Sequence, residues 1–139
     1  MFETIAQNFI KNTQFIVVGA SSNRQKFGNR ILRWYQLNDL QVTPINPKEN
    51  VIEGLPTLKS IEQVADPANT SISIITPPSV TLNVLQEAKR LGFKSIWIQP
   101  GAEDSHVVEY VEKENDLQVI HSGPCLLVKG PSLLVKSRI

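Results

Sequence analysis

The sequence is poor in cysteine and has no long apolar segment. Cys125 is the single cysteine among 139 residues, which excludes an internal disulfide and a zinc site built from several cysteines. The longest apolar run, around residues 15–20, has the length of a strand, whereas a membrane-spanning helix needs about 20 apolar residues. The first ten residues carry Glu3 and lack the basic-then-apolar pattern of a secretion signal. These absences predict a cytoplasmic protein that does not enter a membrane.

Neither sign of charge predominates, because 14 basic and 13 acidic residues give a formal net charge of +1. A chain with this balance has no broad positive field that would attract nucleic acid. Any anion must therefore be bound by a few local groups. The length is typical of one domain, and no linker or repeat divides the chain. We expect a single domain over residues 1–139, with residues 129–139 as a C-terminal tail.

Apolar segments of strand length alternate with amphipathic segments of helix length. This alternation is typical of an α/β protein: a Rossmann-like, three-layer α/β/α fold around a parallel five-stranded sheet. We expect the strand order 3-2-1-4-5. The predicted strands cover residues 14–20, 40–45, 71–75, 94–98 and 117–120, and the predicted helices cover residues 1–11, 27–35, 60–65, 79–91 and 103–115.

The C-terminal segment gives a weaker pattern. Residues 123–128 have the composition of a further short strand, and Lys129-Gly130-Pro131 would end it. Residues 132–139 are apolar with basic ends, which is consistent with docking on the core or on another subunit. A homodimer or another protein partner therefore stays open.

The loop after the first predicted strand has the features of a phosphate site. In Rossmann-like sheets, ligands bind at the carboxyl ends of the strands, where the strand order reverses. Here the chain places small residues and two hydroxyls, followed by Arg24, just before a predicted helix. The loop is not the GxGxxG fingerprint of NAD sites, because Ser21 and Arg24 stand at the second and third glycine positions.

The end of the second predicted strand favours a phosphorylated ribose. An NAD site usually has an acidic residue there for the ribose hydroxyls, whereas this chain has Asn46, Pro47 and Lys48. The Lys48 ammonium suits a phosphate on the adenosine ribose. Coenzyme A and NADP both carry such a phosphate, and NAD does not.

The third and fourth predicted strands end in proline-containing turns, Thr76-Pro77-Pro78 and Gln99-Pro100-Gly101. Both turns stop a strand in any case, because proline fixes φ. In addition, they predict a rigid shelf beside the ligand. Ser79 is a candidate cap for the helix that follows.

Taken together, the motifs resemble those of the CoA-binding domain family, and the chain is similar to the N-terminal domain of the succinyl-CoA synthetase α subunit. The resemblance extends from about residue 15 to residue 125. It implies a Rossmann-like fold with coenzyme A lying across the strand ends. The phosphorylated histidine of that ligase lies in a further domain, so the resemblance predicts no ligase activity. The motifs, in order, are Val17–Ser21, Asn46–Lys48, Thr76–Pro78, Ile96–Gly101 and Cys125.

The resemblance also implies a role for individual residues in three parts of the site. It assigns the phosphates to Gly19, Ala20, Ser21, Ser22 and Arg24, the adenosine end to Asn46, Pro47 and Lys48, and the pantetheine to Thr76, Pro77, Pro78, Gln99, Pro100 and Gly101.

The candidates for catalysis are few. Cys125 and His121 lie four residues apart, a spacing that could serve nucleophilic chemistry. The apolar neighbours of Cys125 instead indicate a buried, inert thiol, and no two carboxylates form an obvious acid and base pair. We therefore expect binding of coenzyme A or an acyl-CoA without catalysis. The alternatives are an NADP-binding small oxidoreductase or redox-sensing domain, and an interaction protein with an empty cleft.

Overall fold

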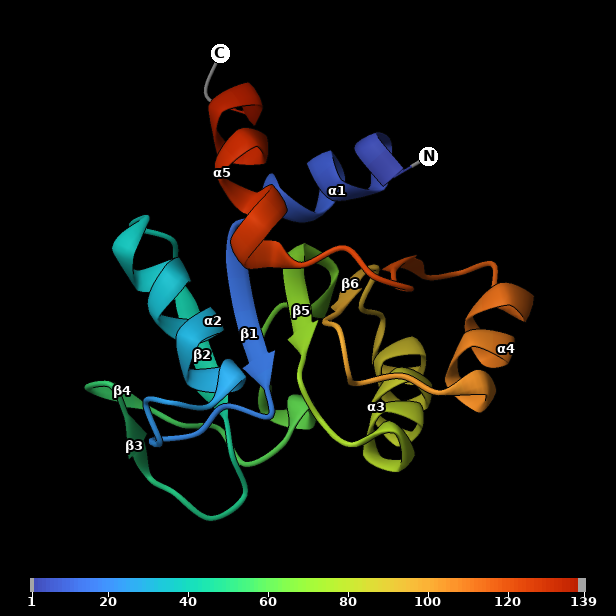
Figure 1. The fold of residues 1–139 in the computed structure, drawn as a ribbon. Coiled ribbons are helices and arrows are strands. Elements are labelled where there is room, and N and C mark those ends of the chain that lie inside the picture. The colour runs from blue at the N-terminus through green and yellow to red at the C-terminus, as the bar shows by residue number, and fades with distance from the viewer. Residues whose placement is uncertain (1, 138–139) are drawn as a thin grey trace.

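The computed structural model describes residues 2–137 and contains a parallel, five-stranded sheet with helices on both faces (Figure 1). The Rossmann-like α/β architecture predicted from the sequence is confirmed. All four strand pairs in the sheet are parallel, as βαβ crossovers require. The strands are β1 (Gln14–Val18), β2 (Val42–Ile45), β5 (Thr70–Ile74), β6 (Ser95–Ile98) and β7 (Gln118–Ile120).

The helices form two outer layers. On one face lie α1 (Phe2–Ile10), α2 (Phe27–Leu37) and α5 (Leu126–Ser137), and on the other lie α3 (Pro78–Leu91) and α4 (Ser105–Lys113). Strand β1 serves both layers, because successive side chains of a strand point to opposite faces. Its residues Phe15 and Val17 pack with the first layer, and Ile16 and Val18 with the second.

The expected strand order was wrong. The observed order is β2-β1-β5-β6-β7, so that the third predicted strand pairs with the first and not with the second. Pro44 in β2 explains why the second strand is an edge: proline has no N–H to donate to a second neighbour. All five residues of β5 are buried, as expected for a central strand. The strand order therefore reverses between β1 and β5.

The chain between β2 and β5 also differs from expectation. It forms a two-stranded antiparallel hairpin of β3 (Val51–Ile52) and β4 (Leu55–Pro56). The helix predicted over residues 60–65 is a single 3-10 turn, η1 (Ile61–Gln63), followed by a second turn, η2 (Pro67–Asn69). A parallel bridge between Ile45 and Leu58 joins the segment after the hairpin to the edge strand β2.

The C-terminal segment is a helix, and not a short strand followed by a tail. Helix α5 contains Pro131 in its interior, where proline normally breaks a helix. Burial against the rest of the molecule offsets this cost, because Leu133 and Leu134 are buried in the same cluster as α1 and α2. Residues up to Ser137 thus pack on the core, with α5 beside α1 (Figure 1).

Buried hydroxyl groups connect the sheet to this helical layer. The Tyr35 hydroxyl lies 2.7 Å from the Ser73 hydroxyl, and burial raises the pKa of the Tyr35 phenol well above its usual range. Ser71 donates to the Phe9 carbonyl at 2.7 Å. Each of these buried hydroxyl groups thus has the partner that its desolvation demands.

Candidate functional site

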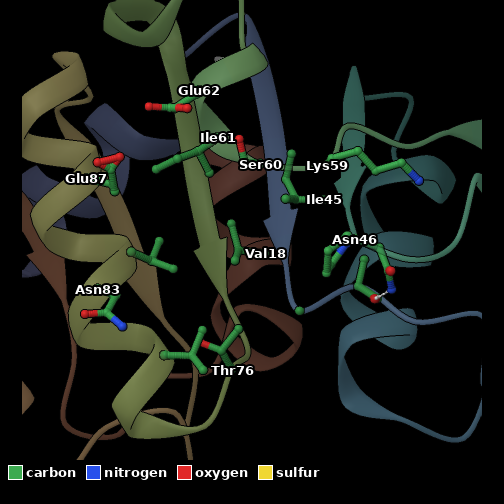
Figure 2. A pocket seen from close by; sticks show the side chains of 15 residues that line it. Val18, Ile45, Asn46, Lys59, Ser60, Ile61, Glu62, Thr76, Asn83 and Glu87 are labelled. Atoms are coloured by element: carbon green, nitrogen blue, oxygen red, sulfur yellow. Dashed lines mark hydrogen bonds between the residues drawn. The ribbon is translucent and has the colours of Figure 1, made fainter.

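A cleft of about 400 Å³ opens at the carboxyl ends of β1 and β2, beside α3 (Figure 2). It adjoins the point where the strand order reverses, which is where ligands bind in open α/β sheets. Much of its wall is apolar. The lining residues are Val18, Gly19, Ala20, Ile45, Asn46, Pro47, Lys59, Ser60, Ile61, Glu62, Thr76, Val80, Asn83, Val84 and Glu87.

Two glycines let the loop after β1 pack directly on its neighbours. Gly19 has a φ of +96°, and a Cβ atom there would lie 2.2 Å from the carbonyl oxygen of Ile75. A Cβ atom at Gly28, in the first turn of α2, would lie 2.2 Å from the carbonyl oxygen of Gly19. Any larger residue would force these backbones apart. The glycines therefore close the inner end of the site.

The carbonyl groups of this loop are held by asparagine side chains. Asn46 donates from Nδ2 to the Ala20 carbonyl at 3.0 Å (Figure 2), and Asn29 donates to the Ser21 carbonyl at 2.9 Å. The loop also has its own turn, in which the Asn23 N–H donates to the Ser21 hydroxyl. These contacts fix the course of the backbone at the end of β1.

A carboxylate lies against this loop. The Ser22 N–H donates to Glu49 Oε2 at 3.2 Å, and Asn46 Nδ2 lies 3.4 Å from the same oxygen. Backbone N–H groups at the carboxyl end of the first strand are those that a phosphate group would use. In this structure the Ser22 N–H instead donates to the carboxylate of Glu49.

The segment that carries Glu49 is fixed at its backbone. Asn46 Oδ1 accepts from the N–H groups of Lys48 and Glu49 at 2.8 and 2.9 Å, which is an Asx turn. The Glu49 carbonyl accepts from the Thr57 hydroxyl at 2.6 Å and from Lys59 Nζ at 3.0 Å. The β3–β4 hairpin thus determines where the Glu49 side chain begins.

The cleft has a basic side chain on one wall and acidic side chains on the other (Figure 2). Lys59 is the only lysine or arginine among the described residues that line it, and its side chain runs away from Asn83 and Glu87 (Figure 2). Glu62 and Glu87, on the opposite wall, both pair with Arg90, at 2.6 and 2.8 Å. The hydrogen bond from Arg90 lowers the pKa of the Glu87 carboxyl. Both carboxylates are therefore compensated before any ligand arrives.

The structure brings some of the predicted site residues together. Five of them line the cleft, whereas Ser21, Ser22 and Arg24 continue the loop beyond it. Arg24 is exposed and pairs with Glu53 at 3.4 Å. The five lining residues are Gly19, Ala20, Asn46, Pro47 and Thr76.

Other predicted residues lie outside this cleft. Lys48 is exposed and is not part of the wall. Pro77 is the N-cap of α3 and Pro78 is its first residue, a position that favours proline. Ser79 is therefore inside the helix and does not cap it. Gln99, Pro100 and Gly101 follow β6 and do not line the cleft.

Gln99 has a structural contact that the sequence did not indicate. Its side chain is fully buried, and Oε1 accepts from the Leu126 N–H at 3.1 Å. Its Nε2 has no hydrogen-bond partner within residues 2–137. The amide oxygen of Gln99 therefore binds the first residue of α5, and its amide nitrogen donates to no group in the described residues.

Cys125 and His121 form no pair in the structure. His121 Nδ1 lies 2.6 Å from the Ser122 hydroxyl, and the Ser122 N–H is held by Glu103. Cys125 is half-buried, and not fully buried as expected; its carbonyl accepts from the first turn of α5. Within the described part of the chain, no three His, Cys, Asp or Glu side chains gather as metal ligands.

Sequence reasoning missed two segments of the wall. The first is residues 59–62, which enters the cleft because the hairpin folds back on the edge of the sheet. The second is one face of α3, where Val80, Asn83, Val84 and Glu87 recur at helical spacing. Val80 is 43% exposed. That spacing was available in the sequence as a signal.

Comparisons with known proteins identify relatives over most of the chain. The family model described as a CoA binding domain matches residues 13–131. An ADP-forming acetate–CoA ligase from Methanocaldococcus jannaschii is 31% identical over 119 residues, which are 85% of this chain. The chain spans 16% of the length of that relative.

Solved structures share the fold. A conserved hypothetical protein from Pyrococcus furiosus is 35% identical, with a TM-score of 0.75, and the match covers 84% of this chain and 97% of that one. A hypothetical protein from Pyrococcus horikoshii reaches a TM-score of 0.82 at 19% identity, over 96% and 92% of the two chains. Within residues 2–137, no helix is both long and apolar enough to traverse a bilayer.

Proposed function

The chain belongs to the CoA-binding domain family, and we propose that it binds coenzyme A or an acyl-CoA in the cleft beside the β1–β5 switch point. One observation carries this proposal: a glycine loop with backbone donors adjoins a largely apolar cleft at the carboxyl ends of β1 and β2. Phosphates favour such a loop, and a planar base favours an apolar wall.

The parts of the ligand can be assigned from the chemistry of the walls. The pyrophosphate would lie at the loop of Gly19–Arg24, and the adenine between Ile61 and Val84, in the apolar part of the cleft. The ribose would then lie near Asn46 and Pro47, with Lys48 at the rim for its phosphate. The pantetheine would leave past Thr76, Pro77 and Pro78 toward Gln99, Pro100 and Gly101.

We propose that this module binds without catalysing a reaction of its own. The His121 ring lies beside the Ser122 hydroxyl, and the carboxylates of the cleft wall are paired with Arg90. The acetate–CoA ligase relative is far longer than this chain. A step on the bound thioester would then be carried out by another protein or domain.

Thermal unfolding in the presence of candidate ligands tests the proposal. A ligand that binds only the native state at one hundred times its Kd stabilises it by about 2.7 kcal/mol. Coenzyme A and acetyl-CoA should raise Tm, whereas NAD and AMP should raise it less. A rise with NAD alone would refute the proposal, and a larger rise with NADP than with coenzyme A would favour an NADP-binding domain.

A further inference from the structure

The Glu49 carboxylate accepts a hydrogen bond from the Ser22 N–H, a backbone donor that a phosphate of the proposed ligand would also use. Its Oε2 accepts from the Ser22 N–H at 3.2 Å, and Asn46 Nδ2 is 3.4 Å away. Ser22 belongs to the loop after β1, and Asn46 lines the cleft. A phosphate oxygen and the Glu49 carboxylate cannot both occupy the Ser22 donor, since two anions at one N–H repel each other.

The backbone of Glu49 is held by contacts in which its side chain takes no part. Asn46 Oδ1 accepts from its N–H, and Thr57 and Lys59 donate to its carbonyl. Displacement therefore needs only a change of side-chain rotamer. The cost of that change is the lost hydrogen bond to a charged acceptor, and the site incurs it each time a phosphate enters.

We propose that Glu49 is an internal competitor for the phosphate-binding loop, which lowers the affinity of the cleft for ligands with a pyrophosphate and leaves uncharged nucleosides unaffected. This inference rests on the proposed function, because it places the pyrophosphate at the same loop. Glu49 is then a determinant of affinity and of ligand class. The walls formed by Ile61 and Val84 would bind the base in either case.

Calorimetric titration of adenosine, ADP, dephospho-CoA and coenzyme A tests the proposal at one fixed ionic strength. Glu49→Gln keeps the shape and removes the charge, and Glu49→Ala also vacates the donor. Both variants should bind the three pyrophosphate ligands about tenfold more tightly than the parent, as expected for release of one charged hydrogen bond. Adenosine should bind parent and variants alike.

Glu112→Gln is the matched control, because it removes the same charge from an exposed position on α4 that does not line the cleft. It should change affinity by less than about twofold, because salt screens a distant, exposed charge. An equal gain in Glu112→Gln, or an equal gain for adenosine, would overturn the competitor role. So would unchanged or weaker binding of ADP and coenzyme A to both Glu49 variants.

The two proposals fail in different ways. If the parent binds coenzyme A and the Glu49 variants gain nothing, the competitor role is refuted and the proposed function stands. If neither parent nor variants bind coenzyme A, the proposed function is refuted, and the competitor role with it. Thermal unfolding without ligand checks that each variant is folded, and Glu49→Gln retains all three backbone contacts.

Discussion

Gly19 lies where the chain leaving β1 passes closest to the next strand. Glycine is required at this position for two reasons. Its φ is +96°, and an added Cβ atom would lie only 2.2 Å from the Ile75 carbonyl oxygen. The first is conformational and costs about 1 kcal/mol for alanine. The second reason is steric. The contacted atom belongs to the backbone, so a change of side-chain rotamer cannot relieve the clash.

We expect Gly19→Ala to lower the free energy of unfolding by roughly 3 kcal/mol, which urea denaturation would measure. Gly54→Ala is the matched control, because Gly54 also has a positive φ of 78° but has open space around it. It should cost about 1 kcal/mol. Equal losses in the two variants would show that the contact with Ile75 is relieved at little cost.

At the scale of elements, α5 depends on a close contact with α2. A Cβ atom at Gly130 would lie 2.4 Å from the Trp34 ring, although glycine inside a helix is normally unfavourable. The absence of a side chain thus lets α5 reach α2. Its neighbours Leu133 and Leu134 are then buried.

Gly130→Ala should therefore destabilise the protein by about 1–2 kcal/mol, opposite in sign to the usual effect of alanine in a helix. Chemical denaturation would measure it, with Ser132→Ala on the exposed side of α5 as the control. That control should be neutral or slightly stabilising. In a Trp34→Leu background the Gly130→Ala change should become stabilising, and a persistent loss there would contradict the steric explanation.

The sequence predicts elements better than it predicts their arrangement. β-branched runs and helical periodicity depend on local residues, so the five sheet strands and four of the helices were predictable. The side of β1 on which β5 pairs depends on distant contacts, and Pro44 was the one local indication that β2 is an edge. Pro131 misled in the opposite sense, because tertiary burial of α5 outweighs a local helix breaker.

The same limit applies to the site. The glycine loop was predictable, because ligands bind where strands of this fold end. Glu49 and Lys59 were not, because both positions depend on how the β3–β4 hairpin folds back over the loop. A charge pattern read along the chain instead favoured Lys48, which lies outside the wall of the cleft.

At the scale of the whole molecule, ion pairs join neighbouring helices within each of the two helical layers. Lys136 of α5 pairs with Glu3 of α1, and Lys89 of α3 pairs with Glu114 after α4. Hydrogen bonds from basic side chains lower the pKa of four carboxyls below the usual value of 4.5. These are Glu3, Glu87, Glu109 and Glu114.

A lowered pKa in the folded state means that the unfolded chain binds protons first as the pH falls. The stabilising contribution is complete above the unfolded pKa of 4.5 and is lost as the pH falls through the lowered folded values. We expect the urea midpoint to be nearly constant from pH 7 to 5 and to fall below about pH 4.5. Glu114→Gln should reduce this slope, and a midpoint that rises on acidification would contradict the assignment.

The central position of β1 also affects how the molecule folds. Strand β1 pairs with β2 across one crossover, whereas the pairing of Gln14 with Thr70 closes a longer loop that also contains the hairpin and both 3-10 turns. Closing that longer loop has the larger entropic cost, and such distant contacts slow folding. We therefore expect the β1–β5 amides to acquire protection late in pulsed hydrogen exchange. Before β1 and β5 pair, Gly19 does not contact Ile75 and the cleft has not formed. A partly folded chain would therefore not bind the ligand.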